Sequence, residues 1–294
     1  MASEQMTQLI ELMRSMPRDR SASIEQQREA MEEGTKAFPA LDLEIVPVEA
    51  NGVPSEWVKP STETPGVILY LHGGAYVAGS PRTHRNLTTR LAEATQHRLL
   101  AIDYRMAPEH PHPAAVEDAV AAYRFLLEGA SSPKQIAVVG DSAGGGLTVA
   151  LLVALKDAGL PQPGCAVPIS PWTDMEGVGE SWTTRADVDP MIDPDDLRKK
   201  GAMYLGGADP RTPTAAPIYA DLSGLPPMLI PVGDAEVLLD DSLTLAKRAR
   251  EAGVDVTLDH ADEMIHVWPL FAGLAPESDA ALERIAEFVA KHVG

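Results

Sequence analysis

The sequence predicts an α/β protein with a mostly parallel central sheet, helices on both faces of that sheet, and a helical cap. Short apolar runs alternate with helical patterns along most of its 294 residues, which is typical of βαβ units. Glycine-rich turns directly follow two of these runs, at residues 72–74 and 140–144. A Gly-, Pro- and Asp-rich segment between Asp174 and Pro217 interrupts the alternation and is too long for an ordinary connection.

Length and composition favour one soluble core without a membrane segment. A chain of this size can bury one large core, and its hydrophobic content of 45% with 23% charged residues is ordinary for a globular protein. No apolar stretch reaches the roughly 18 residues that a membrane span needs. The first residues carry Glu4 and Glu11 and show no secretory signal, so we expect a cytoplasmic protein.

Charge and cysteine content argue against several kinds of site. The formal net charge of −19 disfavours nucleic acid and anionic lipid as partners. Cys165 is the only cysteine, which excludes an internal disulfide and a thiolate zinc cluster. It lies in an apolar run, so we expect a buried structural thiol.

The N-terminal region predicts a helix followed by antiparallel strands. The helix has one apolar face, which would either pack on the body of the protein or line a substrate pocket; its residues are Met6, Leu9, Ile10, Met13 and Met16. A strand-like pattern begins near Leu43, and Asn51-Gly52 is a hairpin signal. Antiparallel strands should therefore lead the sheet.

The remaining elements alternate in chain order. Apolar runs predict buried strands at residues 66–72, 98–104, 135–140, 165–170, 227–233 and 254–260. Helical patterns cover residues 84–95, 114–128, 143–157, 239–252 and 278–291. Such an order predicts parallel pairing with helices on both faces of the sheet.

Two irregular regions predict the cap. Within the interrupting segment, residues 193–200 (DPDDLRKK) have the pattern of a capped helix start. Together with the N-terminal helix, this segment could roof one end of the sheet. We therefore divide the chain into an N-terminal cap segment (1–40), a cap insertion (176–215) and a core formed by residues 41–175 and 216–294.

Ser142 lies in a glycine-flanked turn between a predicted strand and a predicted helix. Residues 140–144 read Gly-Asp-Ser-Ala-Gly, which matches the G-x-S-x-G nucleophile elbow in the context that this motif requires. The Ala143 amide would face the oxygen that becomes negative during acyl transfer. The alternatives are a packing turn and a phosphate loop, but the lysine of a P-loop is absent.

A second glycine turn, His72-Gly73-Gly74, directly follows another predicted strand. Because neither glycine has a Cβ, the amides of Gly73 and Gly74 can approach a carbonyl closely and would complete an oxyanion hole with Ala143. Each such donor is typically worth about 3 kcal/mol in the transition state. We expect His72 to hold this loop by hydrogen bonding rather than to act as a base.

Several motifs occur in the order found in one esterase family. They are "HGGAYVAGS", "DYRMAPEHPHPAAVEDA", "GDSAGGGL", "SPWTD", "EVLLDDS" and "MIHVW", and the similarity runs from about residue 40 to the C-terminus. The chain resembles the hormone-sensitive-lipase-like (family IV) carboxylesterases of the α/β-hydrolase fold. The resemblance implies a Ser-acid-His carboxylesterase with a helical cap and no metal or organic cofactor, and a homodimer that pairs through an edge strand.

In this fold the catalytic residues follow the chain order serine, acid, histidine. Three histidines follow Ser142, namely His260, His266 and His292. His292 lies near the end of the last predicted helix, and His260 closes a predicted strand from which it could face the site. His266 lies in the loop after that strand and resembles the "MIH" motif of the family, so it is the expected base.

The catalytic acid must follow the predicted strand at 227–233, where four carboxylates compete. Asp240 and Asp241 open a predicted helix and are expected to cap it. Aligning "EVLLDDS" with the usual "DPLRDE" of the family places Glu236 where most members have aspartate, with Asp234 and Asp240 as alternatives. Glutamate can orient an imidazole in the same way if the loop accommodates its extra methylene.

The expected function is the hydrolysis of short-acyl carboxylic esters through an acyl-enzyme. The alternatives are a lactone hydrolase that uses the same triad and a non-catalytic small-molecule binder on a hydrolase scaffold. Candidate apolar walls of the substrate pocket are Trp172, Trp182, Met191, Met203 and Tyr204. Asp103, Arg105 and Asp118 are expected to be structural.

Overall fold

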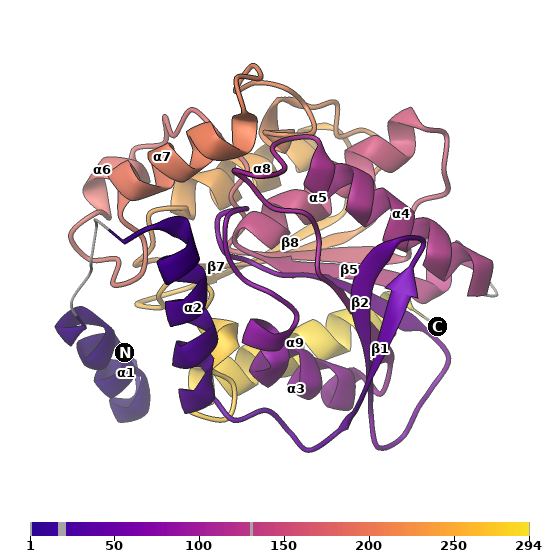
Figure 1. Ribbon diagram of the computed structural model, residues 1–294, viewed down its shortest axis with the longest axis horizontal. Coiled ribbons are helices and arrows are strands. Elements are labelled where there is room, and N and C mark those ends of the chain that lie inside the picture. The colour runs from indigo at the N-terminus through magenta and orange to yellow at the C-terminus, as the bar shows by residue number, and fades with distance from the viewer. Residues whose placement is uncertain (1, 17–21, 130–131, 294) are drawn as a thin grey trace.

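The computed structural model describes residues 2–16, 22–129 and 132–293, and its centre is an eight-stranded sheet (Figure 1). The strand order is β1-β2-β4-β3-β5-β6-β7-β8. The β1–β2 and β2–β4 pairs are antiparallel, and all other pairs are parallel. The predicted α/β class, with antiparallel strands at the start of the sheet, is confirmed.

The strands are short, and the central ones are buried on both faces. Their bounds are β1 (Glu44–Ala50), β2 (Val53–Lys59), β3 (Val67–Leu71), β4 (Arg98–Ile102), β5 (Ile136–Asp141), β6 (Cys165–Ile169), β7 (Met228–Gly233) and β8 (Val256–Ala261). β1 and β2 form the hairpin predicted by Asn51-Gly52, and both turn residues have a positive φ, as a type I′ turn requires. Cys165 is a buried free thiol, as expected.

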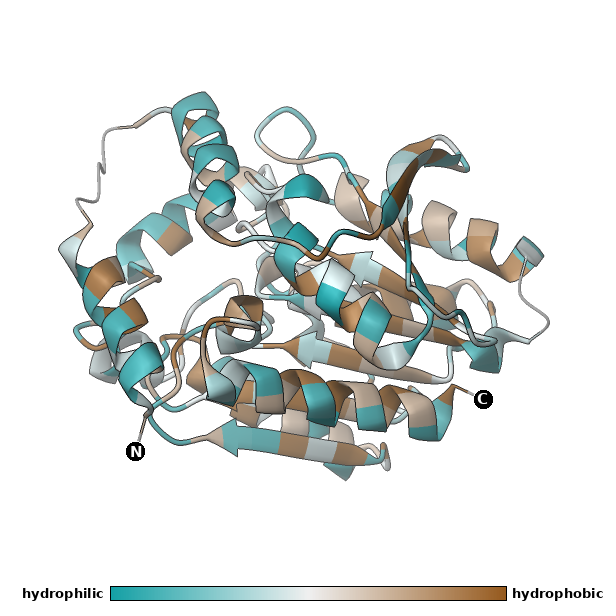
Figure 2. Cartoon of the chain, turned by 90° about the horizontal axis from the view of Figure 1, so that it is seen from below, coloured by the Kyte–Doolittle hydropathy of each residue, from teal (hydrophilic) through white to brown (hydrophobic). Residues whose placement is uncertain are grey.

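Helices cover both faces of the sheet (Figure 1). α3 (Arg85–Thr95) and α9 (Pro276–His292) pack on one face, where Ile68 and Tyr70 of β3 point. α4 (Ala114–Gly129) and α5 (Ala143–Asp157) pack on the other, and α8 (Leu239–Glu251) continues that layer beside α5. Figure 2 shows the strands mostly brown and the helices alternating between brown and teal, as expected for amphipathic helices around a buried sheet.

The remaining helices lie at one end of the sheet. They are α1 (Glu4–Ser15), α2 (Ile24–Gly34), α6 (Ser181–Thr184) and α7 (Pro194–Leu205). Short 3-10 helices complete the described chain: η1 (Thr35–Ala37), η2 (Arg82–His84), η3 (Pro133–Gln135), η4 (Pro217–Tyr219) and η5 (Trp268–Phe271). Within the described ranges, no helix is long and apolar enough to cross a membrane.

The sequence predicted helix α1 but not helix α2. α1 packs its apolar face, centred on Met6, against a cluster that includes Ile265 and Trp268, so it supports the body of the protein. α2 was not predicted, because Ile24 and Met31 are its only large apolar residues. A capping box formed by Ser23 and Gln26 was the available signal for its start.

Candidate active site

Ser142 lies in a sharp turn between β5 and α5. Its φ of 55° and ψ of −119° are strained for a residue with a side chain, and they direct the hydroxyl out of the strand-to-helix junction. The turn is held by bonds from the Ser142 amide to the Ile169 carbonyl (2.8 Å) and from the Trp172 amide to the Ser142 carbonyl (2.9 Å). A Cβ on Gly144 would collide with the backbone of Leu71, so the start of α5 requires glycine there.

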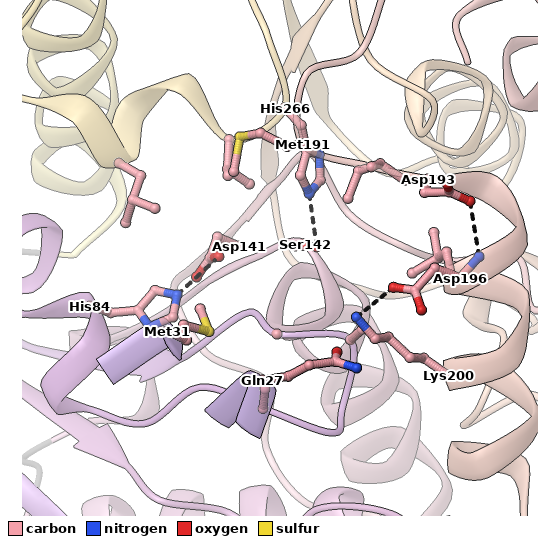
Figure 3. A pocket seen from close by; sticks show the side chains of 17 residues that line it. Gln27, Met31, His84, Asp141, Ser142, Met191, Asp193, Asp196, Lys200 and His266 are labelled. Atoms are coloured by element: carbon pink, nitrogen blue, oxygen red, sulfur yellow. Dashed lines mark hydrogen bonds and ion pairs between the residues drawn. The ribbon is translucent and has the colours of Figure 1, made fainter. Parts of the chain in front are cut away.

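The structure brings Ser142, Glu236 and His266 together from three separate loops. The Nε2 atom of His266 lies 2.9 Å from the Ser142 hydroxyl (Figure 3). The Nδ1 atom of His266 lies 2.6 Å from Oε2 of Glu236. His266 and Glu236 are almost fully buried. Such a chain of contacts is the geometry in which a base accepts a proton from a serine while an acid orients the base.

Hydrogen bonds fix the Glu236 carboxylate in one orientation. Its Oε1 atom accepts the Gly233 amide (2.5 Å) and the Ser170 hydroxyl (2.9 Å), while Oε2 faces His266. The Ser170 hydroxyl in turn accepts the amide of Val267 (3.1 Å), the residue after His266. The loop after β7 therefore accommodates the longer glutamate side chain, and Ser170 joins the acid loop to the histidine loop.

The other candidates for acid and base lie elsewhere. Asp234 pairs with Arg185 (3.1 Å) and with His260 (3.6 Å), so His260 does not face Ser142. His292 bonds the carbonyl of Phe288 within α9. Asp234 follows β7 as Glu236 does, but His260 lies within β8 and His292 ends α9, and none of the three bonds Ser142.

Asp240 and Asp241 lie in the first turn of α8, as expected, but the expected cap is wrong, because the residue at the N-cap of this helix makes no side-chain capping bond. The Asp241 carboxylate accepts the amides of Thr173 and Asp174 and the indole N–H of Trp182, and Asp240 accepts the amide of Ser181. Both carboxylates thus bond the segment 173–182 to the helix that follows Glu236. Burial raises the pKa of Asp241 to about 7.

The environment of His266 favours its charged form. Burial alone would lower the pKa of His266, but the hydrogen bond and the charge of Glu236, together with the charges of Asp189 and Asp141, outweigh it and raise this pKa above its ordinary value of 6.5. A raised pKa suits a base that must hold a proton in the transition state.

Of the two glycines expected to serve the oxyanion hole after β3, only Gly74 lines the cavity. The Gly73 amide donates to Oδ1 of Asp141 (3.0 Å), so the expected role of Gly73 in the oxyanion hole does not fit this structure. Gly74, which was predicted, and Ala75, which was not, line the cavity beside Ser142, with positive φ values of 119° and 56°. Ala143 begins α5 next to the nucleophile, as predicted.

A buried charged pair beside the nucleophile was not predicted. His84 Nε2 lies 3.4 Å from Oδ2 of Asp141, and Tyr70 donates to Oδ1 of Asp141 (2.6 Å). Burial opposes both charges, but each partner stabilises the other, so the pKa of His84 is raised and that of Asp141 is lowered. Asp141 thereby holds Gly73 in place, and no local sequence signal links it to His84.

His72 has the structural role that the sequence analysis gave it. Its Nδ1 atom bonds the Gly73 carbonyl (2.8 Å), and its ring stacks on Tyr104, whose hydroxyl donates to the His72 carbonyl (2.7 Å). Burial, together with the charge of His84, lowers the pKa of His72 to about 3, so its ring is neutral. Arg105 and Asp118, also expected to be structural, bind each other (2.7 Å).

A cavity of about 230 Å³ opens above Ser142 (Figure 3). The loop after β3, α2, the loop of His266 and the segment from Met191 into α7 line it, and its larger apolar side chains are Met31, Met191, Ile192, Leu197, Val267 and Leu270. Of the five predicted wall residues, only Met191 lies there. Trp172, Trp182 and Tyr204 are buried in the adjoining core, and Met203 is exposed on α7. Within the described chain, no group of three or more His, Cys, Asp or Glu side chains is arranged to hold a metal ion.

Comparisons with known proteins show esterases and α/β hydrolases that are similar to this chain. The sequence model of one family, described as alpha/beta hydrolase fold, matches residues 68–270. An acetyl-hydrolase of Streptomyces hygroscopicus is 44% identical over 100% of this chain and 99% of its own length. An esterase of Acinetobacter venetianus is 35% identical over 89% of this chain and 87% of its own. A crystal structure of an esterase from the bacterial hormone-sensitive lipase (HSL) family is 46% identical, with a TM-score of 0.95 over 100% of both chains.

Proposed function

The chain belongs to the hormone-sensitive-lipase-like carboxylic ester hydrolases of the α/β-hydrolase fold, and on this premise we propose that Ser142, His266 and Glu236 are its catalytic triad. The observation that carries the proposal is the continuous contact from the Ser142 hydroxyl through both ring nitrogens of His266 to Glu236. A serine hydroxyl is a weak nucleophile unless an adjacent base removes its proton, and this arrangement supplies that base.

The reaction proceeds in two halves. Ser142 Oγ attacks the ester carbonyl while His266 Nε2 takes its proton, and the amides of Gly74, Ala75 and Ala143 receive the oxyanion. His266 then gives the proton to the leaving alcohol, which departs and leaves an acyl group on Ser142. A water molecule attacks this acyl-enzyme with His266 as base, and the carboxylic acid leaves as the serine regains its proton.

The cavity supports a preference for short acyl groups. Its volume of about 230 Å³ is smaller than the roughly 300–1,000 Å³ of typical ligand pockets. Met31 of α2 and Met191 of the cap insertion close the space around Ser142. A cyclic ester would use the same three side chains, so a lactone is the alternative substrate.

Three other features remain predictions from the sequence: a cytoplasmic location, the absence of nucleic-acid and membrane partners, and pairing of two copies through an edge strand. β8 is one edge of the sheet, and sedimentation analysis would test whether two copies pair there.

Ser142→Ala tests the assignment of the nucleophile. On a panel of p-nitrophenyl esters of increasing acyl length and γ-butyrolactone, we expect a loss of turnover on the order of 10⁶-fold, as in other triad hydrolases. Ser61→Ala, at an exposed site whose hydroxyl bonds Glu93, is the control and should keep full activity. An organophosphate should label Ser142 covalently if the protein is an enzyme, whereas a non-catalytic binder would not react. Wild-type turnover in Ser142→Ala would overturn the proposal.

A further inference from the structure

The oxyanion loop, as we call residues 72–80 after β3, would present the Gly74 and Ala75 amides and needs support from its surroundings. Ala75 (φ 56°) and Tyr76 (φ 61°) are consecutive residues with side chains in the left-handed region. Such backbone conformations persist only where neighbouring contacts fix them. Within the loop, Val77 and Ala78 donate their amides to the Gly74 carbonyl, and the Ala107 amide donates to the Tyr76 carbonyl (2.9 Å).

Arg28, on cap helix α2, makes two further bonds to this region. Its Nε atom donates to the Val77 carbonyl (2.7 Å), and its Nη2 atom donates to the Ala107 carbonyl (3.0 Å). Val77 and Ala107 are fully buried. The outer edge of the guanidinium faces Glu109, at 2.8 Å from each carboxylate oxygen. One planar side chain thus bonds both segments that hold the strained loop.

The same helix walls the cavity above Ser142. Gln27 and Met31 of α2 point into the cavity (Figure 3), whereas the adjacent pair, Arg28 and Glu32, face the loop after β3. Glu32 accepts the Ser80 hydroxyl (2.6 Å). Residues four apart lie on one side of a helix. Gln27 and Met31 therefore form a row that faces the cavity, and Arg28 and Glu32 form a second row that faces the oxyanion loop.

We propose that Arg28 is a positioning residue for the oxyanion hole. By binding the Val77 and Ala107 carbonyls, it fixes the backbone that directs the Gly74 and Ala75 amides toward the oxyanion. The cap helix therefore contributes to stabilisation of the transition state as well as to the shape of the pocket. This inference rests on the proposed function, since it presupposes acyl transfer at Ser142.

Arg28→Ala and Arg28→Lys test the proposal by steady-state kinetics on p-nitrophenyl acetate. Removal of a whole oxyanion donor costs about 10²–10³ in kcat, and misplacing the donors should cost less, so we expect Arg28→Ala to lower kcat by about 10–100-fold with little change in KM. Arg28→Lys keeps the charge near Glu109 but cannot bond both carbonyls in the same way. Its kcat should lie between those of the wild type and Arg28→Ala. Inhibition by a trifluoromethyl ketone, which forms an oxyanion on serine, should weaken in parallel with kcat.

Two control variants separate positioning from general stability. Glu109→Gln removes the ion pair but leaves the carbonyl bonds of Arg28. Lys36→Ala, in η1 directly after α2, removes an exposed ion pair with Glu33. Both variants should keep kcat. An unchanged kcat in folded Arg28→Ala, or in Arg28→Lys if the alanine variant fails to fold, would overturn the proposal. So would a rise in KM alone, which indicates a pocket-wall role. Activity retained in Ser142→Ala would refute the proposed function instead.

Discussion

Glu236→Gln replaces one oxygen of the buried acid by an amide group of nearly the same shape. Because Oε1 accepts the Gly233 amide, the oxygen of the new side chain must take that position, since an NH₂ group there would face another donor. The NH₂ group is then directed at Nδ1 of His266, 2.6 Å from the atom it replaces. Nδ1 must accept a hydrogen bond, so the proton of the neutral ring moves to Nε2.

A proton on Nε2 blocks the first step of the reaction. That nitrogen lies 2.9 Å from the Ser142 hydroxyl and can no longer take its proton. In Ser-His-Asp hydrolases the equivalent change from acid to amide lowers kcat by about 10⁴ through this tautomer. We expect a loss of similar size, which corresponds to about 5 kcal/mol of transition-state stabilisation. KM should change little, because Glu236 is buried behind the base and does not line the cavity.

The assay is steady-state hydrolysis of p-nitrophenyl acetate, with thermal unfolding to show that the variant is folded. Asp234→Asn is the matched control, since Asp234 lies in the same loop but pairs with Arg185 and His260. As a partly exposed residue away from the nucleophile, it should change kcat by no more than about twofold. A Glu236→Gln enzyme that retains more than about a tenth of wild-type kcat, against the 10⁴ expected, would refute the reasoning.

Two further predictions concern pH. Since His266 must be neutral to accept a proton and its pKa is raised above 6.5, kcat/KM should rise with pH through a midpoint above 6.5, and a pH profile with a lower midpoint would contradict the assignment. The folded-state pKa of Asp241, about 7, lies above its ordinary 3.8, so its contribution to the free energy of unfolding is greatest below pH 3.8 and is lost as the pH rises to about 7. Urea unfolding across this range should show that loss in the wild type but not in Asp241→Asn, and parallel curves would show that Asp241 does not titrate there.

The sequence predicts those parts of the fold and site that short patterns determine. The strand-to-helix turn around Ser142 requires small neighbours over five residues, and the Asn51-Gly52 hairpin requires two residues with positive φ. Ser142 could be named because it lies in such a local pattern, whereas His266 was identified by its resemblance to the "MIH" motif of the family. The prediction of Glu236 depended on an alignment with the family motif. The structure shows why glutamate fits there, because the Gly233 amide and the Ser170 hydroxyl donate hydrogen bonds to its carboxylate.

The features that the sequence did not predict depend on contacts between distant residues. The Gly73 amide is engaged because Asp141, 68 residues away, turns its carboxylate toward β3. Asp241 has the pattern of a helix-capping residue, yet the amides it accepts belong to Thr173 and Asp174. α2 lacks a strong apolar periodicity because much of its contact with the body is made by polar side chains such as Arg28.

α2 and the segment before α7 are therefore bonded to two loops of the proposed site. Arg28 of α2 bonds the loop that would receive the oxyanion, and Asp189 of the cap insertion bonds the loop that carries the acid. One oxygen of Asp189 accepts the Val237 amide (2.8 Å), directly after Glu236, and the other accepts the amides of Met191 and Ile192 (2.7 and 2.9 Å), which line the cavity. Displacement of α2 would therefore also move the loop after β3, and displacement of the segment around Met191 would move the loop that carries Glu236. The pocket walls and the two loops of the proposed site are thus held by the same few polar side chains.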